Sequence, residues 1–239
     1  MKYIYGPVNS RRLGLSLGIN LTPYKICSFN CIYCQLGKTT DKTIERKEYF
    51  KAQDIIEELK NWIQNNPGEA DKINYVTFSG SGEPTLNINI GYLIRQIKSI
   101  TNIKIAVITN ASLLNSLLIR QELMSADLII PSLDAVSEDI FAEIDRPAEA
   151  LKLDGLIEGL VSLSKEFQGK IWLEVMMIKG VNDSPGHIDR LKEVIEKIRP
   201  DKIHLNSPVR VTVEPDIRPL SAKKLEEIKE ILGGRCEIA

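Results

Sequence analysis

The sequence predicts an α/β protein with a parallel sheet at its centre, and two observations support this class. Six short segments, rich in β-branched residues and almost continuously apolar, recur along the 239 residues. Such segments are typical of parallel strands that are buried on both faces. Amphipathic segments separate them, so strand and helix alternate about six times, with right-handed crossovers. Six repeats are too few for a closed eightfold barrel, which leaves a curved partial barrel or an open doubly wound sheet.

The individual elements follow from these patterns in chain order. We predict strands at residues 15–21, 73–80, 103–110, 126–134, 170–178 and 201–209. We predict helices at residues 52–66, 90–100, 118–124, 154–167, 187–198 and 221–234. Ser221 suits the N-cap of the last helix, and Gly233 suits its end. No linker-like stretch interrupts the alternation, so we expect a single domain over residues 1–239.

The composition is that of an ordinary globular protein, with 43% hydrophobic and 26% charged residues. The N-terminus lacks the apolar stretch of a signal peptide, and no run of about 18 apolar residues exists. We therefore expect no membrane span and a cytoplasmic location. The formal net charge is −1, yet residues 1–51 hold nine Lys/Arg and three Asp/Glu, a net of +6. This asymmetry indicates either an anionic ligand or partner near the first segment or a solvated basic surface.

Three of the four cysteines lie within eight residues, at Cys27, Cys31 and Cys34. Clustered cysteines in a chain without a secretion signal more often bind metal or serve redox chemistry than form disulfides. A structural zinc site would need a fourth ligand from Cys236 or a histidine, all of which are distant in sequence. Three thiolates on a short loop suit three irons of a cubane and leave the fourth iron open. An iron–sulfur cluster is thus favoured, with zinc or no metal as alternatives.

The triplet, with Tyr33 just before the third cysteine, resembles the signature of the radical S-adenosylmethionine (radical SAM) enzymes. The segment "SGSGEP" at residues 79–84 resembles their GGEP motif, with Ser81 in place of one glycine. The segments "SRRLGLSLGIN", "WLEVMMIKGVND" and "HLNSPVR" also resemble one branch, which groups small proteins with the enzymes that build the tricyclic wyosine base on tRNA. The resemblance covers nearly the whole chain. It implies a partial (βα)6 parallel-stranded TIM-like barrel of the radical SAM type.

The resemblance also implies the cofactors and their chemistry. Cys27, Cys31 and Cys34 would bind a [4Fe–4S] cluster, and the amine and carboxylate of S-adenosylmethionine would chelate its unique iron. Reduction would then cleave S-adenosylmethionine to methionine and a 5′-deoxyadenosyl radical, which abstracts hydrogen from a substrate. A low-potential electron donor, a ferredoxin or flavodoxin, would supply the electron.

Further residues are implied at the cofactor. The implied set is Tyr33, Gly80, Gly82, Glu83, Pro84, Asn110, Ser132 and Glu174. Backbone carbonyls beside the two glycines, with Glu83, would bind the methionine ammonium. Asn110 and Ser132 would meet the ribose and Tyr33 the adenine, although capping, turn formation or loop packing would also explain these three.

Four more residues lie near the predicted pocket, and each is as well explained by a structural role: Asp134, Asn182, Asn206 and Arg210. Glu174 lies in mid-strand, where a carboxylate is costly unless it is paired. It points either inward to cofactor or substrate, or outward to a helix lysine.

The substrate is left open, with a tRNA base or a small molecule as candidates. Only one cysteine exists beyond the triplet, so a second cluster held by three cysteines is excluded. An alternative enzyme is an activase for glycyl-radical proteins, which acts on another protein's backbone. An alternative from another class is a non-catalytic iron–sulfur electron carrier or zinc-binding module. The sequence indicates no oligomeric state.

Overall fold

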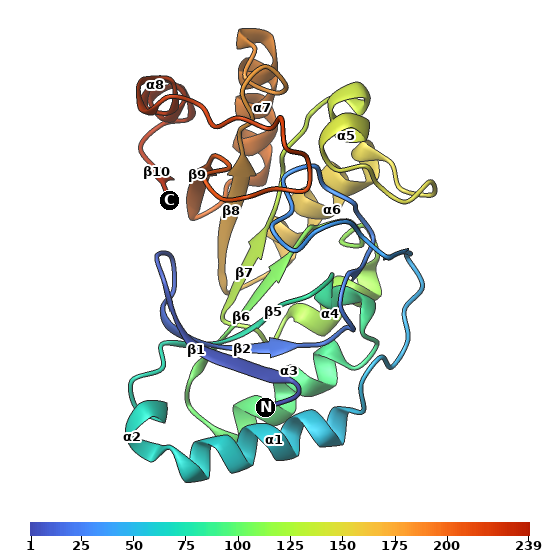
Figure 1. Cartoon of the computed structure of the whole chain (residues 1–239), viewed down its shortest axis with the longest axis vertical. Coiled ribbons are helices and arrows are strands. Elements are labelled where there is room, and N and C mark those ends of the chain that lie inside the picture. The colour runs from blue at the N-terminus through green and yellow to red at the C-terminus, as the bar shows by residue number, and fades with distance from the viewer.

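A single eight-stranded sheet forms the centre of the computed structural model, which describes all of residues 1–239 (Figure 1). The strands follow one another in the order β1-β2-β5-β6-β7-β8-β9-β10. Their bounds are β1 Ile4–Ser10, β2 Gly14–Asn20, β5 Tyr75–Ser79, β6 Lys104–Thr109, β7 Leu128–Pro131, β8 Lys170–Met176, β9 Lys202–Asn206 and β10 Cys236–Ile238. Every neighbouring pair is parallel except β1 with β2. The six predicted strands are the contiguous run from β2 to β9, so the partial (βα)6 barrel is confirmed.

Helices cover the outer face of the curved sheet (Figure 1). Their bounds are α1 Ala52–Asn65, α2 Pro67–Ala70, α3 Ile90–Ile100, α4 Leu117–Leu123, α5 Glu138–Ile144, α6 Leu153–Glu166, α7 Pro185–Ile198 and α8 Ala222–Leu232, with a 3-10 turn, η1, at Pro84–Leu86. The main core lies between these layers, where Phe78 and Leu173 of the sheet and Leu59 of α1 are fully buried. None of the helices is both long enough and apolar enough to cross a membrane.

The inner face of the sheet has a small core of its own. Leu13, in the turn between β1 and β2, packs there with Ala106, Leu128 and Ile130. The turn therefore folds over the inner face of the partial barrel.

Several elements were not predicted, among them β1, α5 and β10. The segment "IYGPVNS" of β1 holds Gly6 and Pro7, and its pairing with β2 is irregular between Tyr5 and Val8. These features interrupt the apolar alternation that identifies a strand. The other two elements are short, with seven and three residues, and short elements give only a weak periodic signal.

Local signals placed several element ends correctly. Pro131 is the last residue of β7, whose pairing with β8 is interrupted until the isolated bridge between Ser132 and Glu174. Ser221 caps α8 by accepting the Lys224 N–H at 3.2 Å, and Gly233 follows the helix with a φ of 92°. The helix predicted from residue 187 begins earlier, at Pro185, where Ser184 caps it by accepting the His187 N–H.

Two glycines of α6 provide a test of its packing. A Cβ at Gly159 would lie 2.5 Å from Asn115 N, whereas at Gly155 the nearest atom is Asn115 Nδ2 at 3.5 Å. We expect Gly159→Ala to lower the free energy of unfolding by about 1–3 kcal/mol because the backbone must move. The matched Gly155→Ala should be neutral or stabilising by up to about 1 kcal/mol. Urea denaturation of both variants checks this, and equal effects would contradict the packing.

Candidate functional site

The cysteine triplet lies on a long loop after β2 that is closed upon itself. Cys27 ends the short strand β3, Ile26–Cys27, which pairs with β4, Asp41–Lys42. The Thr43 N–H donates to Cys27 O at 3.1 Å, and the Thr40 N–H donates to Lys25 O at 3.0 Å. Lys25 itself has a φ of 57°, which turns the chain sharply before the first cysteine. The loop thus presents its three thiols from a fixed backbone.

Polar groups face each of the three sulfur atoms. The Lys25 ammonium donates to Cys34 Sγ at 3.0 Å, and the Asn110 amide lies 3.6 Å from Cys27 Sγ. Cys31 Sγ lies 3.4 Å from Asp145 Oδ1. Burial raises the pKa of Cys27 to about 12 and raises that of Cys31 well above its ordinary value. Free thiols at these two positions are therefore neutral at pH 7, and metal ligation must displace their protons.

The donor set fits an iron–sulfur cluster better than a single metal ion. No three Cys, His, Asp or Glu side chains converge closely enough to hold one ion. Cys236 lies in β10, at the far end of the strand order from β2, so it provides no fourth zinc ligand beside the triplet. Thiolates on three irons of a cubane lie farther apart than thiolates on one ion. Lys25 is buried and hydrogen bonds through its side chain only to Cys34, so the anionic cluster would compensate its charge.

The glycine-rich loop after β5 packs directly against the cysteine loop. The Lys25 N–H donates to Ser81 O at 2.7 Å, and the Glu83 N–H donates to Ile26 O at 3.2 Å. A Cβ at Gly82 would lie 1.8 Å from Ile26 O, so only glycine permits this approach. Gly80 has a φ of 121°, which also favours glycine. The carbonyls of Gly80 and Gly82 accept no hydrogen bond, and both residues are half-buried, so these carbonyls have no partner within the protein.

The Glu83 side chain points into the protein and holds the loop together. Its Oε1 accepts from Thr85 N at 3.0 Å, Thr85 Oγ1 at 2.6 Å and Thr109 Oγ1 at 2.7 Å. Its Oε2 accepts from Asn110 N at 2.8 Å. Burial raises the pKa of Glu83, and these hydrogen bonds oppose the rise. The carboxylate therefore connects η1, which begins at Pro84, to the end of β6, and we expect it to act through this loop.

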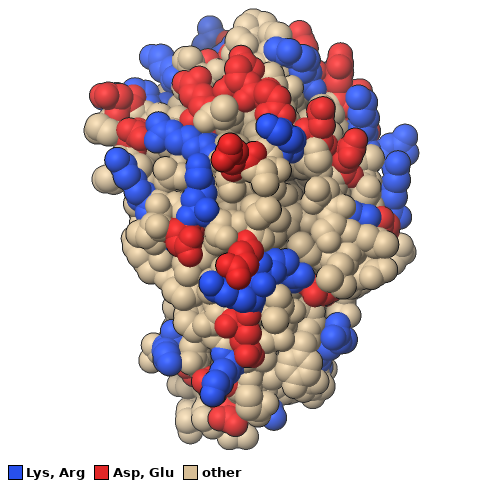
Figure 2. Space-filling model, turned by 90° about the vertical axis from the view of Figure 1, so that its right-hand side faces the viewer, with Lys and Arg blue, Asp and Glu red and all other residues tan.

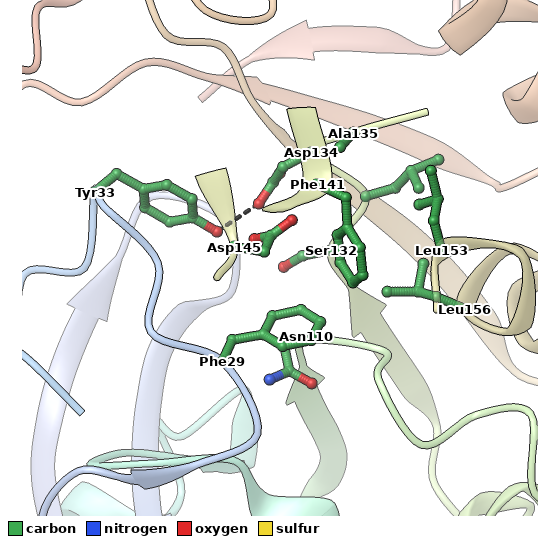
Figure 3. A pocket seen from close by; sticks show the side chains of 11 residues that line it. Phe29, Tyr33, Asn110, Ser132, Asp134, Ala135, Phe141, Asp145, Leu153 and Leu156 are labelled. Atoms are coloured by element: carbon green, nitrogen blue, oxygen red, sulfur yellow. Dashed lines mark hydrogen bonds between the residues drawn. The ribbon is translucent and has the colours of Figure 1, made fainter. Parts of the chain in front are cut away.

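A narrow cavity brings together Tyr33, Asn110 and Ser132 (Figure 3). Its volume of about 10 Å³ is no more than one water requires. The Tyr33 hydroxyl donates to Asp134, which also accepts from Met176 N at 2.8 Å. Burial raises the pKa of Asp134 to about 7. Tyr33, Asn110 and Ser132 thus line one cavity. Their contact with ribose or adenine stays a prediction, and it requires these side chains to move apart.

A larger cavity of about 260 Å³ lies between the β1–β2 turn and the ends of β8 and β9. Glu174 faces it from β8, and there it forms an ion pair with Arg12 and accepts from Asn206 Nδ2 at 2.7 Å. Glu174 thus points inward and pairs with no helix lysine. Arg210 lines the same cavity. Asn182 does not, because its buried amide donates to Asp134 O and Met176 O, which is a structural role.

The sequence did not single out several groups at the site. Arg11 and Arg12 reach the larger cavity from the unpredicted β1–β2 turn, and two adjacent arginines between apolar segments were the available signal. Asp145 follows the unpredicted α5, and burial together with Asp134 raises its pKa well above the ordinary value. No sequence pattern marks this aspartate.

A partial parallel barrel with three clustered thiols beside a glycine-rich loop defines an iron–sulfur enzyme of the α/β class. The family model described as "Radical SAM superfamily" matches residues 21–191, which is most of the chain. The chain therefore belongs to the radical SAM superfamily, whose members use a [4Fe–4S] cluster and S-adenosylmethionine.

Two relatives match almost the full length of the chain. A protein of Brachyspira hyodysenteriae named "GTPase Obg" is 41% identical over 99% of the chain, but the match spans only 34% of that protein. The UPF0026 protein MJ1312 of Methanocaldococcus jannaschii is 38% identical over 98% of the chain and 71% of its own length.

Solved structures share the fold at low identity. A radical SAM methyltransferase from Sphaerobacter thermophilus has a TM-score of 0.69 at 16% identity, covering 94% of this chain and 65% of its own. Archaeal TYW1 has a TM-score of 0.60 at 17% identity, covering 91% of this chain and 71% of its own. Both support the same partial barrel.

The role of Glu83 can be tested without any cofactor. Because its carboxylate accepts four hydrogen bonds, three of them buried, we expect Glu83→Gln to lower the free energy of unfolding of cluster-free protein by about 1–3 kcal/mol. The exposed Glu143→Gln, on α5, is the matched control and should change it by less than about 0.5 kcal/mol. A Glu83→Gln variant as stable as its control, but unable to bind S-adenosylmethionine, would instead assign the carboxylate to the cofactor.

Proposed function

We propose that this protein reductively cleaves S-adenosylmethionine and abstracts hydrogen from a substrate. Cys27, Cys31 and Cys34 would hold a [4Fe–4S] cluster, and the loop of residues 80–84 would hold the methionine part of S-adenosylmethionine. The observation that carries the proposal is the direct contact between these two loops, through Lys25 to Ser81 and Glu83 to Ile26. When bound, the cluster supplies the electron that breaks the sulfonium carbon–sulfur bond.

The chain's own groups have definable tasks in this reaction. The free carbonyls of Gly80 and Gly82 would orient the methionine ammonium beside the cysteine loop. The Lys25 ammonium and the Asn110 amide face sulfur atoms and stabilise negative charge there. Phe29 and Phe141 pack edge to face at 5.5 Å next to Asn110 and Ser132, and this apolar wall helps to exclude water from a radical.

A non-catalytic electron carrier explains less of the site. Electron transfer alone does not require a glycine-rich loop that presents two unpartnered carbonyls next to the cysteine loop. The enzyme instead needs a low-potential donor, for which we propose a cytoplasmic ferredoxin or flavodoxin.

For the substrate, a tRNA base is the class that we propose first. The fold similarity to archaeal TYW1 and the basic first segment support it. Figure 2 shows one face on which Lys/Arg and Asp/Glu side chains are interspersed, without a continuous basic patch. A nucleic acid would therefore need positive charge elsewhere on the molecule, and the larger cavity supplies it.

The proposal is tested by reconstituting the protein with iron and sulfide under anaerobic conditions, reducing it, adding S-adenosylmethionine and measuring the 5′-deoxyadenosine formed. We expect its formation to fall by at least about 100-fold in Cys27→Ala, Cys31→Ala and Cys34→Ala, because each loses a ligand. Cys236→Ala is the matched control and should retain it, since Cys236 lies in β10 away from the triplet. No cleavage by protein that holds four irons and is reduced would favour the electron carrier. Zinc in the isolated protein, with no cluster obtainable, would overturn both iron hypotheses.

Lys25 allows a test of the cluster's surroundings that does not depend on turnover. Its ammonium favours the more negative, reduced cluster, so Lys25→Met should lower the midpoint potential by on the order of 50–100 mV. The exposed Lys38→Met, on the same loop, is the control and should leave the potential nearly unchanged. A redox titration followed by electron paramagnetic resonance measures both variants. Equal potentials in the two variants would show that the Lys25 ammonium does not contact the cluster ligands.

A further inference from the structure

The larger cavity carries an excess of positive charge. Arg11, Arg12 and Arg210 line it, and Glu174 is the one carboxylate among its lining residues. Glu174 is already paired with Arg12. Arg11 is exposed and has no carboxylate partner, while Arg210 is exposed and makes one hydrogen bond, to Gln35 Oε1 at 3.2 Å. Two guanidinium groups are therefore left without a counter-charge.

These arginines come from distant parts of the chain and meet beside the cysteine loop. Arg11 lies in the β1–β2 turn, and Arg210 lies in the irregular segment that follows β9. Gln35, which Arg210 contacts, is the residue after Cys34. The Glu214 N–H also donates to Ile32 O at 3.3 Å, which ties this segment to the cysteine loop. One lining residue of the cavity, Gln35, therefore directly follows a cysteine that is expected to bind the cluster.

The residues expected to hold S-adenosylmethionine lie mostly on other strands. The glycine-rich loop follows β5, and Asn110 and Ser132 follow β6 and β7. The arginine cavity is instead formed by the β1–β2 turn, β8 and β9. A ligand here would reach the cysteine loop at Gln35 and would leave the glycine-rich loop free for the cofactor.

A phosphate group is the ligand that these side chains suit. Guanidinium groups bind phosphate oxygens through paired N–H donors, and several of them together neutralise its charge. Asn9, also in the lining, adds an amide without a partner. The exposed side chains of Val8 and Val209 at the same cavity offer apolar contact to the rest of such a ligand.

We propose that this cavity binds a phosphate group of the substrate through Arg11 and Arg210 and so places the substrate beside the cysteine loop. The role of the phosphate as part of the substrate rests on the proposed function, whereas its binding does not. The phosphate belongs either to a phosphorylated small molecule or to an RNA backbone, and both sources present the same oxygens to the arginines.

Isothermal titration of the reconstituted protein with inorganic phosphate tests the site directly. We expect Arg11→Gln and Arg210→Gln each to weaken phosphate binding by about tenfold, because each removes a charge-assisted contact. Arg11→Lys keeps the positive charge but loses the paired N–H donors of the guanidinium group. Its phosphate affinity should therefore lie between that of the original protein and that of Arg11→Gln. Arg95→Gln, an exposed arginine on α3, is the control and should bind as the unchanged protein does. Circular dichroism confirms that each variant is folded. Failure of the unchanged protein to bind phosphate, or equal binding by all variants, would overturn the proposal.

Two further titrations identify the occupant. Phosphate affinity should be the same with saturating S-adenosylmethionine, and competition between them would overturn the proposal by giving the arginines to the methionine carboxylate. Guanosine 5′-monophosphate and unfractionated tRNA are then compared. If Arg11→Gln and Arg210→Gln bind tRNA more weakly, the phosphate belongs to an RNA backbone. If these variants bind only guanosine 5′-monophosphate more weakly, and tRNA as before, the phosphate belongs to a small molecule. Phosphate binding without any 5′-deoxyadenosine formation would contradict the proposed function but leave the phosphate site standing.

Discussion

The contact between the cysteine loop and the glycine-rich loop is the constraint on which the rest of the site depends. Two backbone hydrogen bonds join them, and a Cβ at Gly82 would collide with Ile26 O at 1.8 Å. Neither loop is fixed by secondary structure of its own, since the cysteine loop contains only the two-residue strands β3 and β4. Each loop therefore depends on the other for its position. The two loops that would bind the cofactor are therefore already oriented before it binds. This orientation lowers the entropic cost of reaching a reactive geometry.

Buried carboxylates connect these loops to the ends of the barrel strands through hydrogen bonds. Glu83 connects the glycine-rich loop to Asn110 at the end of β6. Asp134 connects the ends of the neighbouring strands β7 and β8 in the same way. It accepts a hydrogen bond from Met176 N where Pro131 has interrupted the pairing of these two strands. A buried carboxylate is costly unless its oxygens are satisfied. These two meet that condition through backbone donors, so they fix the strand ends around the site before any ligand is present.

The parts of this structure that were predictable are those encoded locally. Parallel strands buried on both faces give continuous apolar runs, and the triplet and the segment "SGSGEP" are short contiguous motifs. The site also contains groups that meet only through the tertiary fold. Asp145 reaches Cys31 from a loop 114 residues away, and Arg12 reaches Glu174 across 162 residues. Arg12 lies in the turn between β1 and β2, and this turn was not predicted because β1 was not. Gly6 and Pro7 interrupt the apolar pattern of β1. The clustered cysteines were therefore evident from the sequence, while the arginine cavity was not.

The arrangement of charge indicates how such a site could combine reactivity with selectivity. A radical formed at the cluster attacks whatever hydrogen lies closest, so the chemistry itself discriminates little between substrates. Selectivity must come from contacts remote from the reacting atom, where binding energy positions the substrate. The arginine cavity is suited to that task because it is adjacent to Cys34 through Gln35 and does not include the glycine-rich loop, Asn110 or Ser132, which are expected to hold the cofactor. The ion pair between Arg12 and Glu174 fixes one of its walls. Since Arg12 belongs to the same turn that packs Leu13 against the inner face of the sheet, the packing of this turn also shapes the proposed substrate site.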